Sequence, residues 1–424
     1  MKEDLLHYVW RHQKLPLHQL CTTDKESIIL HFVGEHNTYE GPDFIAAKLS
    51  VGSQLWAGNV EIHVKSSDWY AHHHEEDPRY QNVILHVVWE HDMPVFRQDN
   101  SVIPTLELKA YVSASLLQKY KSLLHRPKKK FINCEKDIAG IPPFLMSNWL
   151  ERLYIERLEQ KVIPIKEILA ESANNWEQVL FCFLCKNFGL NINGEAFLSA
   201  ARAVPYHVIQ KTRHKELQLE ALLFGVLGML DQEEDVYVQT LRKEFQFLKS
   251  KFALEDATVT PAFFKLRPSN FPTIRLAQLA QLYFKNENLF SVLTAAKTKE
   301  EMYNILEVGT SDYWQTHFVF GKTSKMSTKR LSNSFKDLLI INTILPIKFC
   351  YQQYKGKGEV DDLFAIIRSI ASEKNSIVEA YKKLSIPAGT AMESQALLQL
   401  HHFYCTKNNC LQCAVGGRLL SGNN

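Results

Sequence analysis

The sequence changes its periodicity once, near residues 125–130, and this change most constrains the fold. Before it, runs of β-forming residues predict strands over residues 27–33, 44–51, 54–65 and 82–90, and a hairpin over 95–108. After it, apolar residues recur every three or four positions, which predicts helices over residues 142–163, 176–188, 195–203, 216–230, 274–284, 335–344 and 393–404. The pattern indicates an α+β protein with a strand-rich domain at 1–125 and a mostly helical domain at 126–424. The basic run His125–Lys130 between them is interpreted as a solvated linker, with a phosphate-binding arm as the alternative.

Composition narrows the class of protein. A chain of 424 residues, 46% hydrophobic and 22% charged, is typical of a globular protein of two domains. Its net charge of +3 does not indicate wholesale wrapping of nucleic acid, so such a contact would need a local patch. Charged residues follow Met1, and the longest apolar stretch, Ala221–Leu230, is too short to span a bilayer. We expect a cytoplasmic protein without membrane contact, and the sequence identifies no protein partner.

Three polar residues share one face of the predicted strand 54–65. Because side chains alternate along a strand, Glu61, His63 and Lys65 project together, and the apolar residues between them face the other way. Asp43 precedes the neighbouring strand in the run Gly41-Pro42-Asp43. An Asp, a Glu and a Lys that converge can bind a divalent cation and activate water. The segment therefore predicts a metal-dependent catalytic site.

This order of residues resembles the signature of the PD-(D/E)XK nuclease superfamily, which has the restriction-endonuclease-like fold. The resemblance covers about the first quarter of the chain and implies a mixed-sheet N-terminal domain in which Asp43 and Glu61 hold Mg²⁺ or Mn²⁺ against a scissile phosphate. His63 stands at the lysine position of the signature, and Lys65 follows one strand period later. Either Lys65 takes the lysine's role, or His63 acts as ligand or base, or the site does not cut. Some members of this fold carry an acidic residue on the first helix, and Glu3, in a predicted helix over 2–12, is the candidate here, with a solvated carboxylate as the alternative.

Over its whole length, the chain also resembles an uncharacterised bacterial family classed only as a domain of unknown function. The stretches Gly58–His63, Arg267–Leu276 and Cys405–Gly416 carry this resemblance, which implies no activity. Our leading hypothesis is a metal-dependent nuclease that hydrolyses phosphodiester bonds of DNA or RNA. The alternatives are a non-catalytic nucleic-acid-binding or assembly module, and a small-molecule metallohydrolase that uses histidines and carboxylates around Zn²⁺. No Gly-rich phosphate loop, nucleophile elbow or dinucleotide fingerprint favours another class of enzyme.

Histidines are concentrated in the strand-rich part, where 12 of the 17 occur within residues 1–125. His86 is the only polar residue inside the apolar run Val83–Trp89, so it is either a satisfied core histidine or part of the site. The run His72-His73-His74 is followed by acidic residues and Pro78, and it is interpreted as an exposed polar loop. The enrichment itself favours a chemical role, since imidazole binds metals and titrates near neutral pH.

The C-terminal cysteines form a second motif, Cys405-x4-Cys410-x2-Cys413. Clustered thiols in a reducing compartment are more typical of metal ligands than of disulfides. A Zn²⁺ site or an iron–sulfur cluster needs a fourth ligand, for which Cys134 is the leading candidate. His401, His402 and Cys350 are alternatives, as is a set of isolated thiols on a frayed terminus. Cys182 and Cys185 lie inside an apolar helical pattern and are interpreted as core residues.

Arg267 and Arg275 flank a Pro-rich loop that leads into a predicted helix. Two arginines beside a helix N-terminus can bind phosphate and so contribute a nucleic-acid contact surface. They can equally tie two helices together through carbonyl and carboxylate groups.

Overall fold

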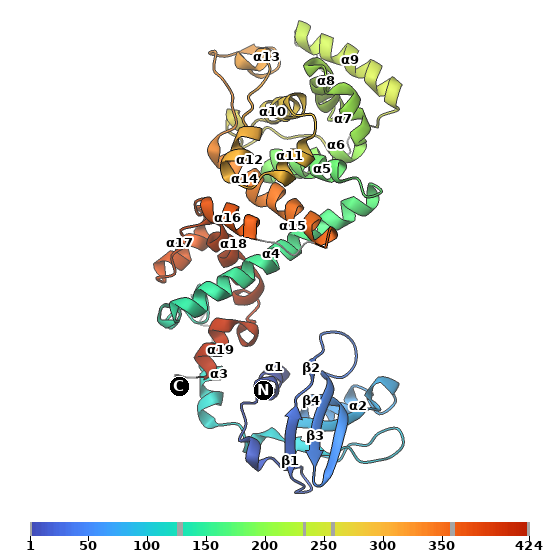
Figure 1. The fold of residues 1–424 in the computed structure, drawn as a ribbon, viewed down its shortest axis with the longest axis vertical. Helices are drawn as coiled ribbons and strands as arrows, with labels where there is room; N and C mark the ends of the chain where they lie inside the picture. Colours follow the sequence, from blue (N-terminus) through green and yellow to red (C-terminus); the bar gives the residue numbers. More distant parts are fainter. Residues whose placement is uncertain (1, 125–129, 232–234, 256–258, 357–360, 422–424) are drawn as a thin grey trace. The chain divides into compact units, whose positions relative to one another are not determined.

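The computed structural model describes residues 2–124, 130–231, 235–255, 259–356 and 361–421 (Figure 1). The chain divides into two compact units. The first comprises Met1–Trp149, Leu384–Ile386 and Leu400–Asn424, and the second comprises Leu150–Lys383 and Pro387–Gln399. The predicted linker at 125–130 lies, apart from Lys130, outside the described residues.

A mixed six-stranded sheet forms the centre of the first unit. Its order is β1-β3-β4-β5-β6, with β2 beside β3, and β4, β5 and β6 run parallel whereas the other pairs are antiparallel. The strands are β1 (Ile28–Phe32), β2 (Glu35–His36), β3 (Phe44–Val51), β4 (Gln54–Lys65), β5 (Val83–Glu90) and β6 (Thr105–Glu107). The four predicted strands are thus confirmed, two of them to the residue.

The predicted hairpin over 95–108 is confirmed around its turn and wrong beyond it. Phe96 and Val102 form an antiparallel bridge, and backbone hydrogen bonds join Arg97 to Ser101 and Ile103 to Val95. The chain then enters β6, which pairs with β5 in the parallel direction and not with the first arm of the hairpin. The reason lies in β5, which is buried from Val83 to Val88. Buried backbone groups need partners, and β6 supplies them at the edge of β5 that β4 leaves open.

Helices cover the sheet and complete the first unit. In α1 (Glu3–Arg11), the apolar side chains Leu5, Leu6, Val9 and Trp10 are all fully buried, and the helix packs on β4. The other helical segments of this unit are α2 (Asp68–Ala71), α3 (Ala114–Leu124), the π-helical η7 (Leu400–Cys405), α19 (Ala414–Ser421) and the 3₁₀ turns η1 (Leu17–Gln19), η2 (Pro78–Tyr80), η3 (Leu108–Ala110), η4 (Ile138–Gly140) and η8 (Cys410–Gln412). Chain segments from both ends of the sequence therefore share one unit.

The second unit is helical, as predicted. Its helices are α4 (Pro143–Glu171, which begins in the first unit), α5 (Trp176–Phe188), α6 (Leu190–Ala203), α7 (Tyr206–Thr212), α8 (Glu216–Val226), α9 (Val236–Phe252), α10 (Pro272–Lys285), α11 (Leu289–Ala295), α12 (Lys299–Ile305), α13 (Asp312–Gln315), α14 (Asn333–Leu339), α15 (Leu345–Tyr354), α16 (Asp361–Ser369), α17 (Ser376–Lys383) and α18 (Ala391–Gln399). The 3₁₀ turn η5 (Pro268–Asn270), the π-helical η6 (Ile340–Ile344) and a short hairpin, β7 (His317–Val319) with β8 (Lys322–Thr323), complete it. Within the described residues, none of the helices has the length and apolar character needed to cross a membrane.

A buried carboxyl group joins three helices of the second unit. Glu220 on α8 is fully buried, and its Oε2 accepts hydrogen bonds from Tyr237 Oη on α9 at 2.6 Å and from Trp314 Nε1 on α13 at 2.9 Å. Burial raises the pKa of Glu220 to about 6, although these donors favour the charged form. The folded protein therefore binds this proton more tightly than the unfolded chain does.

Glu220 is expected to make the stability of the helical unit depend on pH. Its contribution is fully present below pH 4.5, is lost as the pH rises to about 6, and amounts to about 2 kcal/mol. In Glu220→Gln, the free energy of unfolding relative to wild type should rise by about this amount between pH 4.5 and 7, since the amide keeps an acceptor and cannot ionise. Urea titrations across this range test it, with the exposed Glu255→Gln as control. Parallel pH profiles for wild type and Glu220→Gln would contradict the prediction.

Candidate functional site

The antiparallel pairing of β3 with β4 brings Asp43 beside Glu61. Phe44 pairs with Val60, so the residue that precedes β3 lies opposite Glu61. The backbone N–H of Asp43 donates to Glu61 Oε2 at 3.0 Å, and the N–H of Ile62 donates to Asp43 Oδ2 at 3.0 Å. The two carboxylates predicted from the sequence therefore lie together and are oriented by backbone donors.

A β-bulge in β3 lies next to this pair of carboxylates. The register with β4 shifts between Phe44 and Ala47, and Ala46 has a positive φ of 57°. The amide oxygen of Asn59 accepts a hydrogen bond from the Ala46 N–H at 3.2 Å and so satisfies the displaced backbone. Bulges that re-aim side chains occur often beside active sites, and the strain of a non-glycine residue in this conformation must be offset by its surroundings.

Helix α1 contributes two further titratable groups. His7 Nε2 lies 3.1 Å from Asp43 Oδ2. Burial lowers the pKa of His7, but the hydrogen bond and negative charge of Asp43 outweigh it, so the pKa is raised overall. Burial and the Asp43 carboxylate raise the pKa of Glu3. The sequence identified Glu3 as a candidate and missed His7, which follows it by one helical turn and so lies on the same face.

Four histidines form a network that contacts Glu61 through two of its members, His63 and His74. His63 Nδ1 shares a hydrogen bond of 2.9 Å with His86 Nε2, and His63 Nε2 shares one of 3.1 Å with His72 Nδ1. Glu61 Oε1 lies 3.5 Å from His63 Nε2 and 3.4 Å from His74 Nε2. His86 thus contacts the site residue His63 from the neighbouring strand β5 and is fully buried.

The loop of three histidines is not simply an exposed polar loop. His72 and His74 turn toward His63, whereas His73 between them is exposed and has a positive φ of 59°. One nitrogen from each of His63, His72 and His74 can be chosen so that all three lie within 4.8 Å of one another, which is a spacing suited to a shared metal ion. The left-handed residue lets two histidines separated by one position point the same way, and the sequence pattern did not reveal this.

Burial shifts the pKa values of the two central residues, Glu61 and His63, in the directions that favour their neutral forms. Burial and the neighbouring Asp43 carboxylate raise the pKa of Glu61 to about 9. Burial, together with His74 and His72, lowers the pKa of His63 to about 3. Neutral imidazoles and crowded carboxyl groups are the donor set that a divalent cation would stabilise, because the cation relieves the repulsion between carboxylates and needs deprotonated nitrogen.

Lys65 lies at the end of β4, where it is exposed. Its backbone N–H donates to Asp68 Oδ2 at 2.9 Å. Among the described residues, no hydrogen bond or ion pair joins its side chain to Asp43 or Glu61. The polar row predicted on β4 is therefore divided into a buried part, Glu61 and His63, and an exposed end.

The cysteines of the tail lie in the first unit with Cys134. Asn133, which precedes Cys134, donates through its side chain to Cys410 Sγ at 3.3 Å, so the segment around Cys134 contacts the segment that carries the other three cysteines. Cys182 and Cys185 are buried in α5, as predicted for core residues.

Arg275 ties helical segments together. It is buried, donates to Gln278 Oε1 at 2.8 Å and to Asn270 Oδ1 at 2.6 Å, and its guanidinium stacks 3.5 Å from the centre of the Phe335 ring. Its donors are directed at protein amides, which favours the structural alternative for this residue. Arg267 is exposed.

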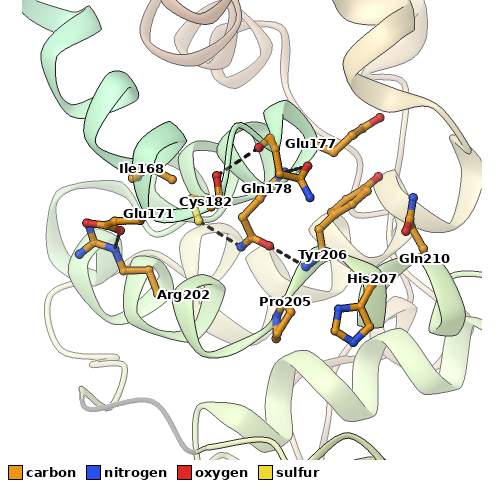
Figure 2. Close-up of a pocket in the computed structure, with 12 residues that line it drawn as sticks. Ile168, Glu171, Glu177, Gln178, Cys182, Arg202, Pro205, Tyr206, His207 and Gln210 are labelled. Atoms are coloured by element: carbon orange, nitrogen blue, oxygen red, sulfur yellow. Dashed lines mark hydrogen bonds and ion pairs between the residues drawn. The ribbon is translucent and has the colours of Figure 1, made fainter.

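A pocket of about 520 Å³ lies in the helical unit (Figure 2). Its polar groups bond to one another: Gln178 Nε2 donates to the Ala201 carbonyl at 3.0 Å, and Arg202 pairs with Glu171 at 3.4 Å. None of the predicted catalytic or metal-binding residues lines it. The candidate site is therefore the carboxylate and histidine cluster around Glu61 in the first unit.

A family model described as "Protein of unknown function (DUF2851)" matches residues 3–376 of the chain. No curated protein and no solved structure matches it.

Proposed function

Since the chain belongs to the DUF2851 family of proteins of unknown function, whose description assigns no activity, we propose from the site itself that this protein is a divalent-metal-dependent nuclease. The single observation that carries the proposal is the convergence of Asp43 and Glu61, held by reciprocal backbone donors, with the neutral imidazole of His63 beside them.

The donors present fit a divalent cation. Asp43 is about one-quarter exposed and Glu61 is buried, so the pair opens to solvent on one side only. Carboxylate oxygens are the ligands preferred by Mg²⁺ and Mn²⁺, and Mn²⁺ also accepts imidazole nitrogen. A bound ion would supply charge neutralisation at a scissile phosphate and a more acidic water.

The side chains of the site would have separate roles in metal binding and proton transfer. Asp43 and Glu61 would hold the ion, and the Ile62 N–H fixes the orientation of Asp43. His63 is better suited to ligation or positioning than to proton transfer, because a pKa near 3 gives it little affinity for a proton at neutral pH. His7 has a raised pKa and a hydrogen bond to Asp43, so it is the imidazole best matched to accept a proton from water.

Nucleic acid as the substrate is supported by the order of the motif. A Pro-Asp before one strand, a Glu-x-His on its antiparallel neighbour and an acidic residue on the preceding helix resemble the layout of the PD-(D/E)XK superfamily. His63 replaces the signature lysine, and His72 and His74 add nitrogen donors that this signature does not include.

The proposal is tested with the wild-type protein. Labelled single- and double-stranded DNA and RNA are incubated with Mn²⁺, with Mg²⁺ and after chelation, while Mn²⁺ binding is followed calorimetrically. We expect cleavage with the added ion, loss of cleavage on chelation, and recovery when Mn²⁺ is returned. Mn²⁺ binding without cleavage of any of these substrates would overturn the nuclease proposal and favour a small-molecule hydrolase.

The second candidate is that small-molecule hydrolase, and the three-histidine cluster favours it. His63, His72 and His74 provide the nitrogen ligands typical of catalytic Zn²⁺ sites, with Glu61 adjacent. It predicts tight Zn²⁺ binding and hydrolysis of small phosphate or carboxylate esters in place of nucleic acid. A protein that binds nucleic acid but neither ion would instead be the non-catalytic module.

A further inference from the structure

Four cysteines from two distant parts of the sequence meet in the first unit. Cys134 lies in a turn, and its own backbone carbonyl accepts hydrogen bonds from the N–H groups of Asp137 and Ile138. Cys405 ends the π-helical η7, Cys410 begins η8, and Cys413 directly precedes α19. Three of the cysteines thus stand at the ends of helical segments, and Cys134 stands in a hydrogen-bonded turn.

Contacts around the cysteines hold the two parts together. Asn133 Nδ2 donates to Cys410 Sγ at 3.3 Å and to Asn408 Oδ1 at 3.1 Å. The rings of Phe131 and His401 stack with their centres 4.8 Å apart. These bonds bring the segment before Cys134 against the segment that carries the other three cysteines.

Gly416 allows the segment that carries three of the cysteines to pack closely against itself. A Cβ atom at this position would lie 1.9 Å from the Cys410 carbonyl oxygen, so only glycine permits α19 to approach the turn this closely. Cys134 and Cys413 are both buried. The arrangement is therefore a close-packed one and not a frayed terminus.

The thiols act on one another electrostatically. Burial raises the pKa of Cys134, and Cys405, Cys413 and Cys410 raise it further. Burial raises the pKa of Cys413 to about 11, while the backbone amides of Gly416 and Val415 and the Trp149 indole favour its thiolate. Hydrogen bonds to the ligand sulfurs, such as those that Cys413 receives, are a usual feature of iron–sulfur sites.

We propose that Cys134, Cys405, Cys410 and Cys413 bind an iron–sulfur cluster. Tetrahedral Zn²⁺ with bonds of about 2.3 Å requires thiolate sulfurs about 3.8 Å apart. Among the described cysteines, no three sulfurs lie all within 4.8 Å of one another. An iron–sulfur cluster places iron and sulfide between its cysteine ligands, so it can bind sulfurs that lie farther apart than those around a single zinc ion. The spacing Cys-x4-Cys-x2-Cys is also that of plant-type iron–sulfur proteins, in which the remote fourth cysteine follows the other three, whereas Cys134 precedes them.

The cluster would fasten the C-terminal segment to the helix that carries part of the candidate site. Tyr8 on α1 donates through its hydroxyl to the Gly417 carbonyl at 3.3 Å, and η8 also contacts α1. Each cysteine loses its thiol proton when it binds iron, and no electron transfer is needed for the cluster to hold the segments. The assignment stands independently of the proposed nuclease activity.

The test is the inorganic content of protein purified without oxygen. Iron and acid-labile sulfide are measured per chain beside zinc, and visible absorption is recorded. We expect a coloured protein with iron and sulfide in the equal amounts that [2Fe–2S] and [4Fe–4S] clusters contain. Stoichiometric zinc without sulfide, or no metal after anaerobic reconstitution with iron and sulfide, would overturn the assignment.

Matched serine variants locate the ligands. Cys134→Ser is expected to lose the visible absorption and most of the iron, whereas Cys21→Ser, a thiol in the same unit outside the cluster, should retain both. If Cys134→Ser fails to fold, Asn133→Ala provides a second test, because loss of the hydrogen bond to Cys410 should shift the reduction potential while the iron content stays unchanged. Unchanged iron and sulfide in folded Cys134→Ser would contradict the proposal. Cleavage is measured on the same samples, so a failed nuclease assay leaves the cluster result intact.

Discussion

Asp43→Asn is expected to lower the rate of metal-dependent phosphodiester cleavage on the order of 10³-fold, because transition-state charge stabilisation by a bound ion is worth several kcal/mol. The asparagine oxygen can still accept from the Ile62 N–H, so the local backbone should persist. The variant should also lose most of its affinity for Mn²⁺, measured by calorimetry. Loss of the neighbouring carboxylate should in addition bring the pKa of Glu61 down toward its ordinary value.

A matched variant separates this effect from general damage. Asp24→Asn makes the same chemical change at an exposed position of the same unit and should leave both cleavage and Mn²⁺ affinity unchanged. Without metal, the midpoint temperatures of thermal unfolding of both variants should be close to that of the wild type. If Asp43→Asn binds Mn²⁺ as tightly as wild type and cleaves at a comparable rate, Asp43 is not a metal ligand and the proposed site is wrong.

Trp10→Ala is expected to destabilise the first unit by about 3–5 kcal/mol, the range for removing a large aromatic side chain from a core. Trp10 is fully buried on α1, and its Nε1 donates to the Val33 carbonyl at 3.0 Å. Because α1 also carries Glu3 and His7, the same change should weaken the contact between His7 and Asp43. Chemical denaturation followed by a probe in the first unit measures the loss.

The variant Trp10→Phe separates the contribution of packing from that of the hydrogen bond. It keeps most of the apolar volume and leaves the Val33 carbonyl without its donor, so a smaller loss of about 1–3 kcal/mol is expected. Equal losses in the two variants would show that the hydrogen bond dominates over packing. Wild-type stability in Trp10→Ala would mean that α1 is not part of this core.

Most of the fold could be predicted because its signals are local. Strand β4 and helix α5 begin and end at the predicted residues, since turn residues and apolar periodicity coincide there. The pairing of the last residues of the predicted hairpin over 95–108 could not be predicted, because β6 is stabilised by parallel pairing with β5, a contact between segments that the local pattern does not encode. Helix α8 ends at Val226 and not at the predicted Leu230. Gly228, which lies between these two residues, takes a positive φ of 65°.

The site was predictable only along the strands. Alternation on β4 and the pairing of adjacent strands suffice to bring Asp43, Glu61 and His63 together. His7 and His74 reach the same place from a helix and a loop, and their directions depend on tertiary packing and on the left-handed conformation of His73. For the cysteines, spacing identified three residues and left Cys134 as the leading candidate for the fourth, and the contact of Asn133 with Cys410 now brings that candidate's segment to the other three.

The first unit is completed by residues that are synthesised after the second unit. The segment from Leu400 leaves the ribosome roughly 10–50 s after Trp149, at translation rates of about 5–20 residues per second. Over that interval, the second unit is made and α1 lacks the partner that its Tyr8 hydroxyl reaches across 409 positions of the sequence. In the order of synthesis, the helical unit is therefore inserted into a first unit that stays incomplete until the segment from Leu400 is made. Prematurely terminated chains would expose that opening, which gives cellular proteases a means to remove them.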